Sequence, residues 1–212
     1  MLSSDLIRRA RRSRLFVIGA LFTALLVLPG CWVMSINALY EESPRDPDIV
    51  VEKNLSGAWS LTDDKCTTIL TVTVSEEVYD LKSVQRGTEC NDAGKESRQQ
   101  ARLVKLGAHY FLDTSPWPDQ ICDACLPLHW IFQVKIDKDV LALSPIESDG
   151  VKKQREAGSV HLEVLPRDPK PAMFESPITL TALPRDLKDF CRRFADDKSV
   201  FKPESVIVFR RV

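Results

Sequence analysis

The chain has 212 residues, which is the size of one globular domain once a membrane segment at its start is set aside. Its 29 Lys and Arg residues nearly balance its 30 Asp and Glu residues, and the net charge is −1. A balanced charge provides no long-range attraction for phosphate backbones, so the composition argues against nucleic acid as a partner.

The start of the chain carries a membrane-export pattern. Five arginines between Arg8 and Arg14 directly precede the uncharged apolar run 15–28. This order is typical of a segment whose basic end stays in the cytoplasm while the following chain crosses the membrane. We therefore expect everything after Tyr40 to lie outside the cytoplasm.

Two kinds of anchor fit this segment. Gly30 directly before Cys31, with Leu28 three residues before the cysteine, resembles the bacterial lipobox, in which the cysteine is lipidated and the preceding peptide is cleaved. Pro29 departs from the small or hydroxyl residue usual there. The alternative is an uncleaved transmembrane helix over residues 15–34, which is long enough to span hydrocarbon. Both place the protein at the cell envelope, and Trp32 after Cys31 suggests the outer membrane, facing the periplasm.

The sequence predicts three parts along the chain. Residues 1–30 are expected to be a signal peptide or signal anchor. Residues 31–54, rich in charge and proline near their end, are expected to be a solvated tether. Residues 55–212 are then the folded domain.

Short segments that alternate apolar and polar residues dominate this domain. They are rich in β-branched side chains and are separated by turn residues, a pattern typical of an antiparallel meander. Predicted strands cover residues 66–74, 78–84, 100–106, 109–113, 129–136, 140–145 and 206–210, with weaker candidates at 160–165 and 177–180.

Two helices are also predicted. Residues 149–157 form a short one, and the clearer one is capped by Thr181, has Pro184 in its first turn and continues to Phe194. The sequence therefore predicts a mainly β fold, a barrel of roughly eight antiparallel strands with one C-terminal helix.

The order of several short motifs resembles a group of uncharacterised bacterial lipoproteins with a lipocalin-like β-barrel. The resemblance runs from Gly30 to near the end of the chain. The motifs are Gly30-Cys31, LSGAW at 55–59, ARLVKLG at 101–107, LPLH at 126–129, and Thr181-Ala182 leading to Phe190 and Phe201. The resemblance implies a lipocalin-like fold and lipidation at Cys31, and it brings no activity or catalytic residues with it.

Cysteine usage fits an oxidising compartment. If Cys31 carries lipid, five cysteines remain, and an odd number favours two disulfides and one thiol. We expect Cys66 to pair with Cys90 and Cys122 with Cys125, although other pairings remain open. Cys191 is then the free thiol.

The Cys122-Asp-Ala-Cys125 segment is the sharpest local motif. Its proline-rich surroundings indicate a loop, which favours a structural disulfide over a redox thiol at a helix N-terminus. A metal site that added His129 and His109 would have only half of a regular zinc pattern. A nucleophile elbow, a phosphate-binding glycine loop and an opposed carboxylate pair are absent from the sequence. We therefore expect no enzyme, no metal and no cofactor.

Aromatic residues on the predicted strands suggest a ligand cavity, because barrels of about eight strands can hold one small molecule. The candidate lining residues are Trp59, Tyr79, Phe111, Trp130 and Phe132, which could equally fill the interior. The leading expectation is a membrane-anchored, non-catalytic module that binds a small apolar ligand or an envelope component. The alternatives are a structural or assembly lipoprotein with a filled core, and thiol-redox or metal binding through the C-x-x-C loop.

Overall fold

The computed structural model describes residues 33–41, 46–63, 65–90, 93–121, 125–160, 162–165 and 178–212. The expected signal segment, Cys31 and Cys122 lie outside the described residues. Among the described residues, no helix combines the length and the apolar character needed to cross a bilayer.

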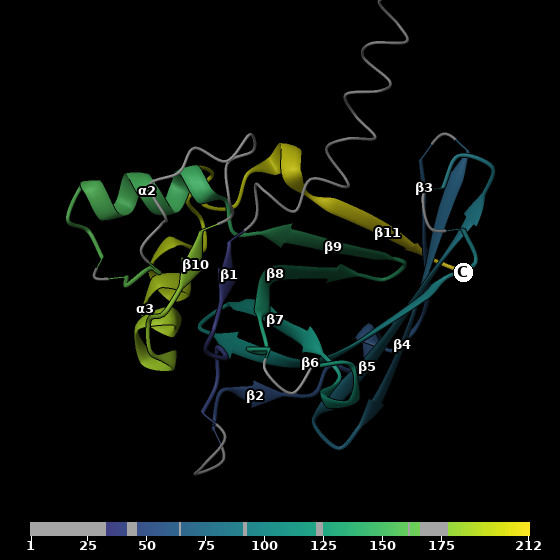
Figure 1. Cartoon of the computed structure of the whole chain (residues 1–212), viewed down its shortest axis with the longest axis horizontal. Coiled ribbons are helices and arrows are strands. Elements are labelled where there is room, and N and C mark those ends of the chain that lie inside the picture. Colours follow the sequence, from purple (N-terminus) through teal and green to yellow (C-terminus); the bar gives the residue numbers. More distant parts are fainter. Residues whose placement is uncertain are drawn as a thin grey trace, which may run out of the picture.

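Eight antiparallel strands close into a barrel (Figure 1). The order around the barrel is β8-β7-β6-β5-β4-β3-β11-β9, and β9 pairs back with β8. The strands are β3 (Gly57–Asp63), β4 (Cys66–Ser75), β5 (Val78–Gly87), β6 (Glu96–Leu106), β7 (His109–Pro116), β8 (His129–Asp137), β9 (Val140–Pro145) and β11 (Ile207–Arg211). Closure removes the exposed strand edges that an open sheet would carry. The predicted fold class is confirmed.

Tight connections set the register of this barrel. The β4–β5 hairpin pairs ten residues of each strand, and Glu76 adopts a φ of 56° in its turn. At the end of β5, Gly87 has a φ of 139°, and a Cβ atom there would lie 1.9 Å from the Lys65 carbonyl oxygen. The backbone can make this close approach only without a side chain.

Three two-residue strands extend the sheet outside the barrel. β1 (Met34–Ser35) pairs with the first residues of β8, β10 (Thr179–Leu180) pairs with β1, and β2 (Ile49–Val50) pairs with β6. β1 pairs with the start of β8, which β9 does not reach. β2 pairs with the part of β6 that lies beyond its pairing with β5.

The described part of residues 31–54 is therefore packed against the domain and is not a free tether. Val33 and Leu39 are buried, and the Val33 N–H donates to the Ile146 carbonyl. Charge and proline content suggested a tether, but a few apolar side chains are enough to dock the segment along the barrel wall. Among the described residues, the folded domain already includes Val33.

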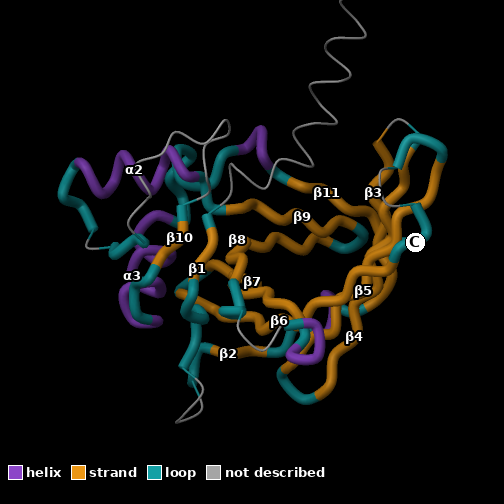
Figure 2. Tube along the Cα trace, in the orientation of Figure 1, coloured by secondary structure: helices purple, strands orange, loops and turns teal. Residues whose placement is uncertain are grey.

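Alternation along β6, β7 and β8 creates two hydrophobic cores. Leu103 and Leu112 face the barrel interior, whereas Val104 and Phe111 face outward into a second core. Two helices cover this outer wall, α2 (Ser148–Glu156) and α3 (Pro184–Phe194). Figure 2 shows both helices gathered on one side of the strands.

Helix α3 presents Leu187, Phe190 and Phe194 to the outer core. Its N-cap is Leu183 and not Thr181, and the cap makes no side-chain hydrogen bond. Proline is favoured at the first helical position because its φ is already helical and it lacks the N–H that would stay unpaired. Pro184 therefore determines where the helix begins. The weak strand expected at 160–165 is reduced to one isolated bridge between Val164 and Leu180.

The cysteine assignments are borne out where the structure describes them. Cys66 and Cys90 form a disulfide, and Cys191 is a buried free thiol. Cys125 is also disulfide-bonded. Complete burial raises the pKa of the Cys191 thiol far above its ordinary value, so this cysteine is neutral and unreactive in the native fold.

Candidate functional site: the barrel interior

One end of the barrel is closed by the short helix η1 (Lys53–Leu55), which precedes β3. Leu55 is completely buried in the inner core, and its carbonyl accepts a hydrogen bond from Trp59 Nε1 at 2.9 Å. The Tyr79 hydroxyl accepts from the Glu52 N–H at 2.7 Å. These bonds satisfy the polar atoms of two large aromatic side chains at this end.

The interior keeps a cavity of about 260 Å³ beyond this closed end. Its apolar wall includes Leu70, Leu81, Phe132, Leu143 and Phe209. Each of these five side chains retains 7–9% of its accessible surface, whereas Trp59 and Tyr79 retain none. The apolar part of the cavity is therefore lined by aliphatic side chains and two phenylalanines, whereas Trp59 and Tyr79 fill the closed end of the barrel.

Polar side chains line the same cavity at the end farther from η1. They are Thr68, Ser83, Ser97, Gln99 and Thr114. On β4, β5 and β7, the polar residue is followed on the same face, toward η1, by an apolar one. The pairs are Thr68 and Leu70, Ser83 and Leu81, and Thr114 and Leu112. The cavity is thus apolar at its floor and polar toward its far end.

The strand connections at this polar end are held in place covalently and by hydrogen bonds. The Cys66–Cys90 disulfide ties the start of β4 to the β5–β6 connection. On the outer face, Arg98 makes two 2.9 Å bonds to Asp80, and its guanidinium carbon lies 4.3 Å from the centre of the Trp117 ring. The Arg98 hydrogen bonds hold the pKa of the Asp80 carboxyl below its usual value. These contacts hold the chain segments around the polar end of the cavity in fixed positions.

The structure separates the five aromatic residues predicted to line a ligand site. Phe132 lines the cavity, as predicted. Trp59 and Tyr79 lie in the inner core but are buried below the cavity. Trp130 is partly buried and packs against the same core. Phe111 faces the opposite way, into the outer core, because it is offset by one residue from the inward-facing Leu112.

Sequence reasoning missed most of the lining residues. Leu70, Leu81, Leu143 and Gln99 carry no local signal except alternation within their strands. Alternation tells which residues share a face, and it could have grouped Leu70 with Val72. It does not tell which shared face leaves space.

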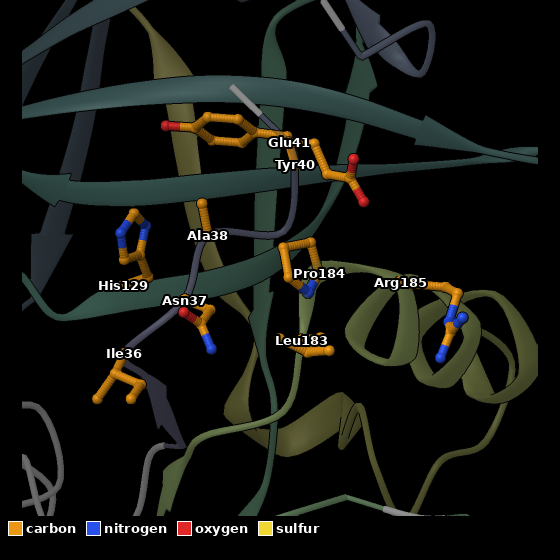
Figure 3. Close-up of a pocket in the computed structure, with 9 residues that line it drawn as sticks. All are labelled: Ile36, Asn37, Ala38, Tyr40, Glu41, His129, Leu183, Pro184 and Arg185. Atoms are coloured by element: carbon orange, nitrogen blue, oxygen red, sulfur yellow. The ribbon is translucent and has the colours of Figure 1, made fainter. Parts of the chain in front are cut away.

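A second cavity lies outside the barrel wall, between residues 36–41 and the start of α3. It is a cleft of about 560 Å³. Figure 3 shows His129 and Tyr40 on one side of this cleft and Leu183, Pro184 and Arg185 on the other.

His129 is held by a buried carboxylate in this cleft. Its Nδ1 lies 2.6 Å from Asp113 Oδ1, and Asp113 Oδ2 accepts from the Leu39 N–H at 2.5 Å. This short contact with the carboxylate fixes the orientation of the imidazole ring. An imidazole oriented by a carboxylate corresponds to two of the three members of a catalytic triad, and the nucleophile is the third.

The third member of a triad is not presented to this cleft by the described residues. Ser35 lies opposite His129 in the β1–β8 register, but it is completely buried and its Oγ accepts from the Asn37 N–H at 3.1 Å. A substrate in the cleft could not reach a buried serine. The Asp113–His129 pair instead fastens the N-terminal segment to the barrel.

The metal alternative finds no support in the described part of the chain. No group of three His, Cys, Asp or Glu side chains there is arranged to hold a metal ion. The sulfur of Cys125 is in a disulfide. His109 contacts Gln133 through Nδ1 at 3.3 Å and lies 3.4 Å from Asp196.

The fold and the cavity together define a closed eight-stranded antiparallel β-barrel with an amphipathic interior cavity. No family model, curated protein or solved structure matches the chain.

Proposed function

We propose that the protein is a non-catalytic binding module, anchored to the membrane outside the cytoplasm, whose barrel holds one small apolar ligand. The observation that carries this proposal is the cavity of about 260 Å³ with its apolar floor. An engineered core cavity of about 150 Å³ holds benzene, so a cavity of this size accommodates a molecule of about ten non-hydrogen atoms.

The wall chemistry favours binding over catalysis. The described residues that line the cavity include no histidine, cysteine, lysine or carboxylate, so its serine and threonine hydroxyls have no general base beside them to activate a nucleophile. The His129–Asp113 pair lies on the other side of the barrel wall. This interior can therefore offer a ligand apolar contacts and a few hydrogen bonds.

The envelope location rests on the arginine-rich start, the apolar run and Cys31. The Cys66–Cys90 disulfide is in keeping with it, since disulfides persist in oxidising compartments. Val33 is already part of the fold and lies two residues after Cys31, a span of at most about 7 Å. A lipid on Cys31 would therefore hold the domain directly against the membrane surface.

Binding of naphthalene, a neutral apolar probe with ten carbon atoms, tests the proposal. The purified full chain is titrated and followed by amide chemical shifts, which are expected to move at cavity residues such as Leu70 and Phe132. Leu143→Trp fills the cavity and should abolish binding. Val208→Trp, on the outward face of the adjacent β11, is the matched control and should bind as the unmodified protein does. If naphthalene leaves the cavity shifts unchanged, the structural role with a filled core replaces the binding role.

A further inference from the structure

The polar side chains in the cavity form a contiguous patch on neighbouring strands. Ser83 and Ser97 are directly opposite each other in the β5–β6 register, and Gln99 is the next inward-facing residue after Ser97. In the described part of the chain, these three side chains form no hydrogen bond to another residue, and none of their polar atoms is both enclosed and unsatisfied. They are therefore open to a molecule in the cavity.

One polar group of the cavity lining is already engaged, because Thr114 Oγ1 donates to the Trp130 carbonyl at 3.4 Å. The Thr68 hydroxyl, the two serine hydroxyls and the Gln99 carboxamide thus remain for a ligand. Together they offer both donors and acceptors within one small patch.

A charged ligand group would find no counter-charge in this cavity. The ionic side chains next to the patch on these two strands, Lys82, Glu96 and Arg98, alternate onto the outer face, where Arg98 is paired with Asp80 at 2.9 Å. Ser83 and Gln99 are half-buried, so a carboxylate or ammonium held beside them would lose part of its hydration without gaining an ion pair. A neutral hydroxyl or amide would lose less and could bond to Gln99 and the two serines.

The apolar part of the cavity lies beyond the patch in the direction of η1. Leu81 lies opposite Gln99 in the register, and Leu70 lies opposite Ser83. Val72, Leu112 and Leu55 continue the apolar wall toward the closed end. A ligand therefore enters with its apolar part first and leaves its polar group near Ser83, Ser97 and Gln99.

We infer that the ligand is an uncharged amphiphile of about ten non-hydrogen atoms, with a hydroxyl or amide head bound by Ser83, Ser97 and Gln99 and an apolar tail on the Leu70, Leu81 and Phe132 wall. This inference rests on the proposed binding function and names its ligand class.

Three eight-carbon probes that differ only in their head test the inference at neutral pH: 1-octanol, octanoate and octylammonium. Binding to the purified full chain is measured by calorimetry, with naphthalene as a probe that has no head. We expect 1-octanol to bind at least tenfold more tightly than either charged probe. Equal affinities, or tighter binding of a charged probe, would overturn the inference even if naphthalene binds.

Gln99→Leu identifies the head-binding group. It should lower the preference for 1-octanol over octanoate by about tenfold or more, because the head loses its carboxamide partner, and naphthalene should still bind because the Leu70, Leu81 and Phe132 wall is intact. Gln100→Leu, at the neighbouring outward-facing position, should leave the preference unchanged. A preference that survives in Gln99→Leu would contradict the assigned head site. Failure of all four probes to bind would overturn the proposed function itself.

Discussion

The Asp113 carboxylate and the His129 imidazole meet at 2.6 Å on the outer wall of the barrel, where both residues are buried. Asp113 also accepts the Leu39 N–H, so one carboxylate connects the N-terminal segment to strands β7 and β8. A buried charge in this position is stabilising only while both of its donors are in place.

Replacing this carboxylate should loosen the N-terminal segment. We expect Asp113→Asn to lower the free energy of unfolding by about 1–3 kcal/mol, because an amide accepts less strongly and turns a donor toward a donor. Hydrogen exchange of the Leu39 amide should also become faster. Urea unfolding and exchange measurements check both effects. Asp139→Asn, whose side chain is 81% exposed, is the control, and an equal loss in it would contradict the assigned role.

Lys188 on α3 should hold the same segment at a second point. Its ammonium lies 2.6 Å from Asp46 and 2.7 Å from Asp48. Burial acts to raise the pKa of Asp46, but the Lys188 hydrogen bond and the backbone N–H groups of Glu41 and Asp48 outweigh it and hold the pKa below its usual value. Lys188→Met leaves a buried carboxylate unpaired, and we expect a loss of about 3–5 kcal/mol at neutral pH.

The pH dependence of this pair has a definite sign. A carboxyl whose pKa is lower in the folded state stabilises the fold above its unfolded pKa, and this stabilisation is lost as the pH falls through the folded value. The unmodified protein should therefore keep this contribution down to about pH 4 and lose it below. In Lys188→Met, burial dominates, so stability should begin to fall at higher pH. Urea midpoints across this range test the prediction, with the exposed Lys198→Met as control. Parallel curves for the two variants would refute it.

The Cys66–Cys90 disulfide should stabilise the polar end of the barrel. It closes a loop with a sequence separation of 24 residues. Replacing both cysteines with alanine should lower the free energy of unfolding by roughly 3 kcal/mol, because the unfolded chain regains the entropy of an open loop. Thr73→Ala, exposed on the same β4 strand, should cost less than about 1 kcal/mol. A double variant as stable as this control would show that the bridge is not needed.

Gly150 should resist a substitution that usually stabilises helices. Gly to Ala within a helix normally gains about 1 kcal/mol. Here a Cβ atom would lie 2.3 Å from the Ser199 carbonyl oxygen and 2.6 Å from the Val200 Cα atom. Gly150→Ala should therefore destabilise the protein by about 1–3 kcal/mol, because α2 must move away from this backbone. Thermal and urea unfolding check the sign against Lys153→Ala, exposed on the same helix. A stabilised Gly150→Ala would disprove the close packing.

Local sequence patterns determined the strands and much of the topology. The segment 66–74 became β4 and 140–145 became β9, because alternation with β-branched residues favours a strand whatever its partner. The Cys66–Cys90 pairing was predicted correctly, and in the structure it joins the start of β4 to the connection that follows the neighbouring β5. Helix α3 followed from its apolar spacing and Pro184, although its cap lay two residues later than Thr181.

Only the tertiary structure decided which face of each strand is the inside. On β6, Leu103 and Val104 are equally apolar neighbours, yet one lies in the barrel and the other under α3. Alternation separates the two faces of a strand but assigns neither to the interior when both are buried. Phe111 and Phe132 therefore looked alike in the sequence and point into different cores.

The cavity and the docked N-terminal segment also depended on closure of the barrel. Space between Leu70, Phe132 and Gln99 arises from how eight strands curve around one another, and no window of consecutive residues records it. Residues 46–54 contain charges that suggest solvent, but Asp46 is buried because Lys188, more than a hundred residues later, neutralises it. The sequence by itself determined most of the barrel strands and both helices, because alternation and apolar spacing are properties of neighbouring residues, whereas the interior cavity required contacts between residues far apart in the chain.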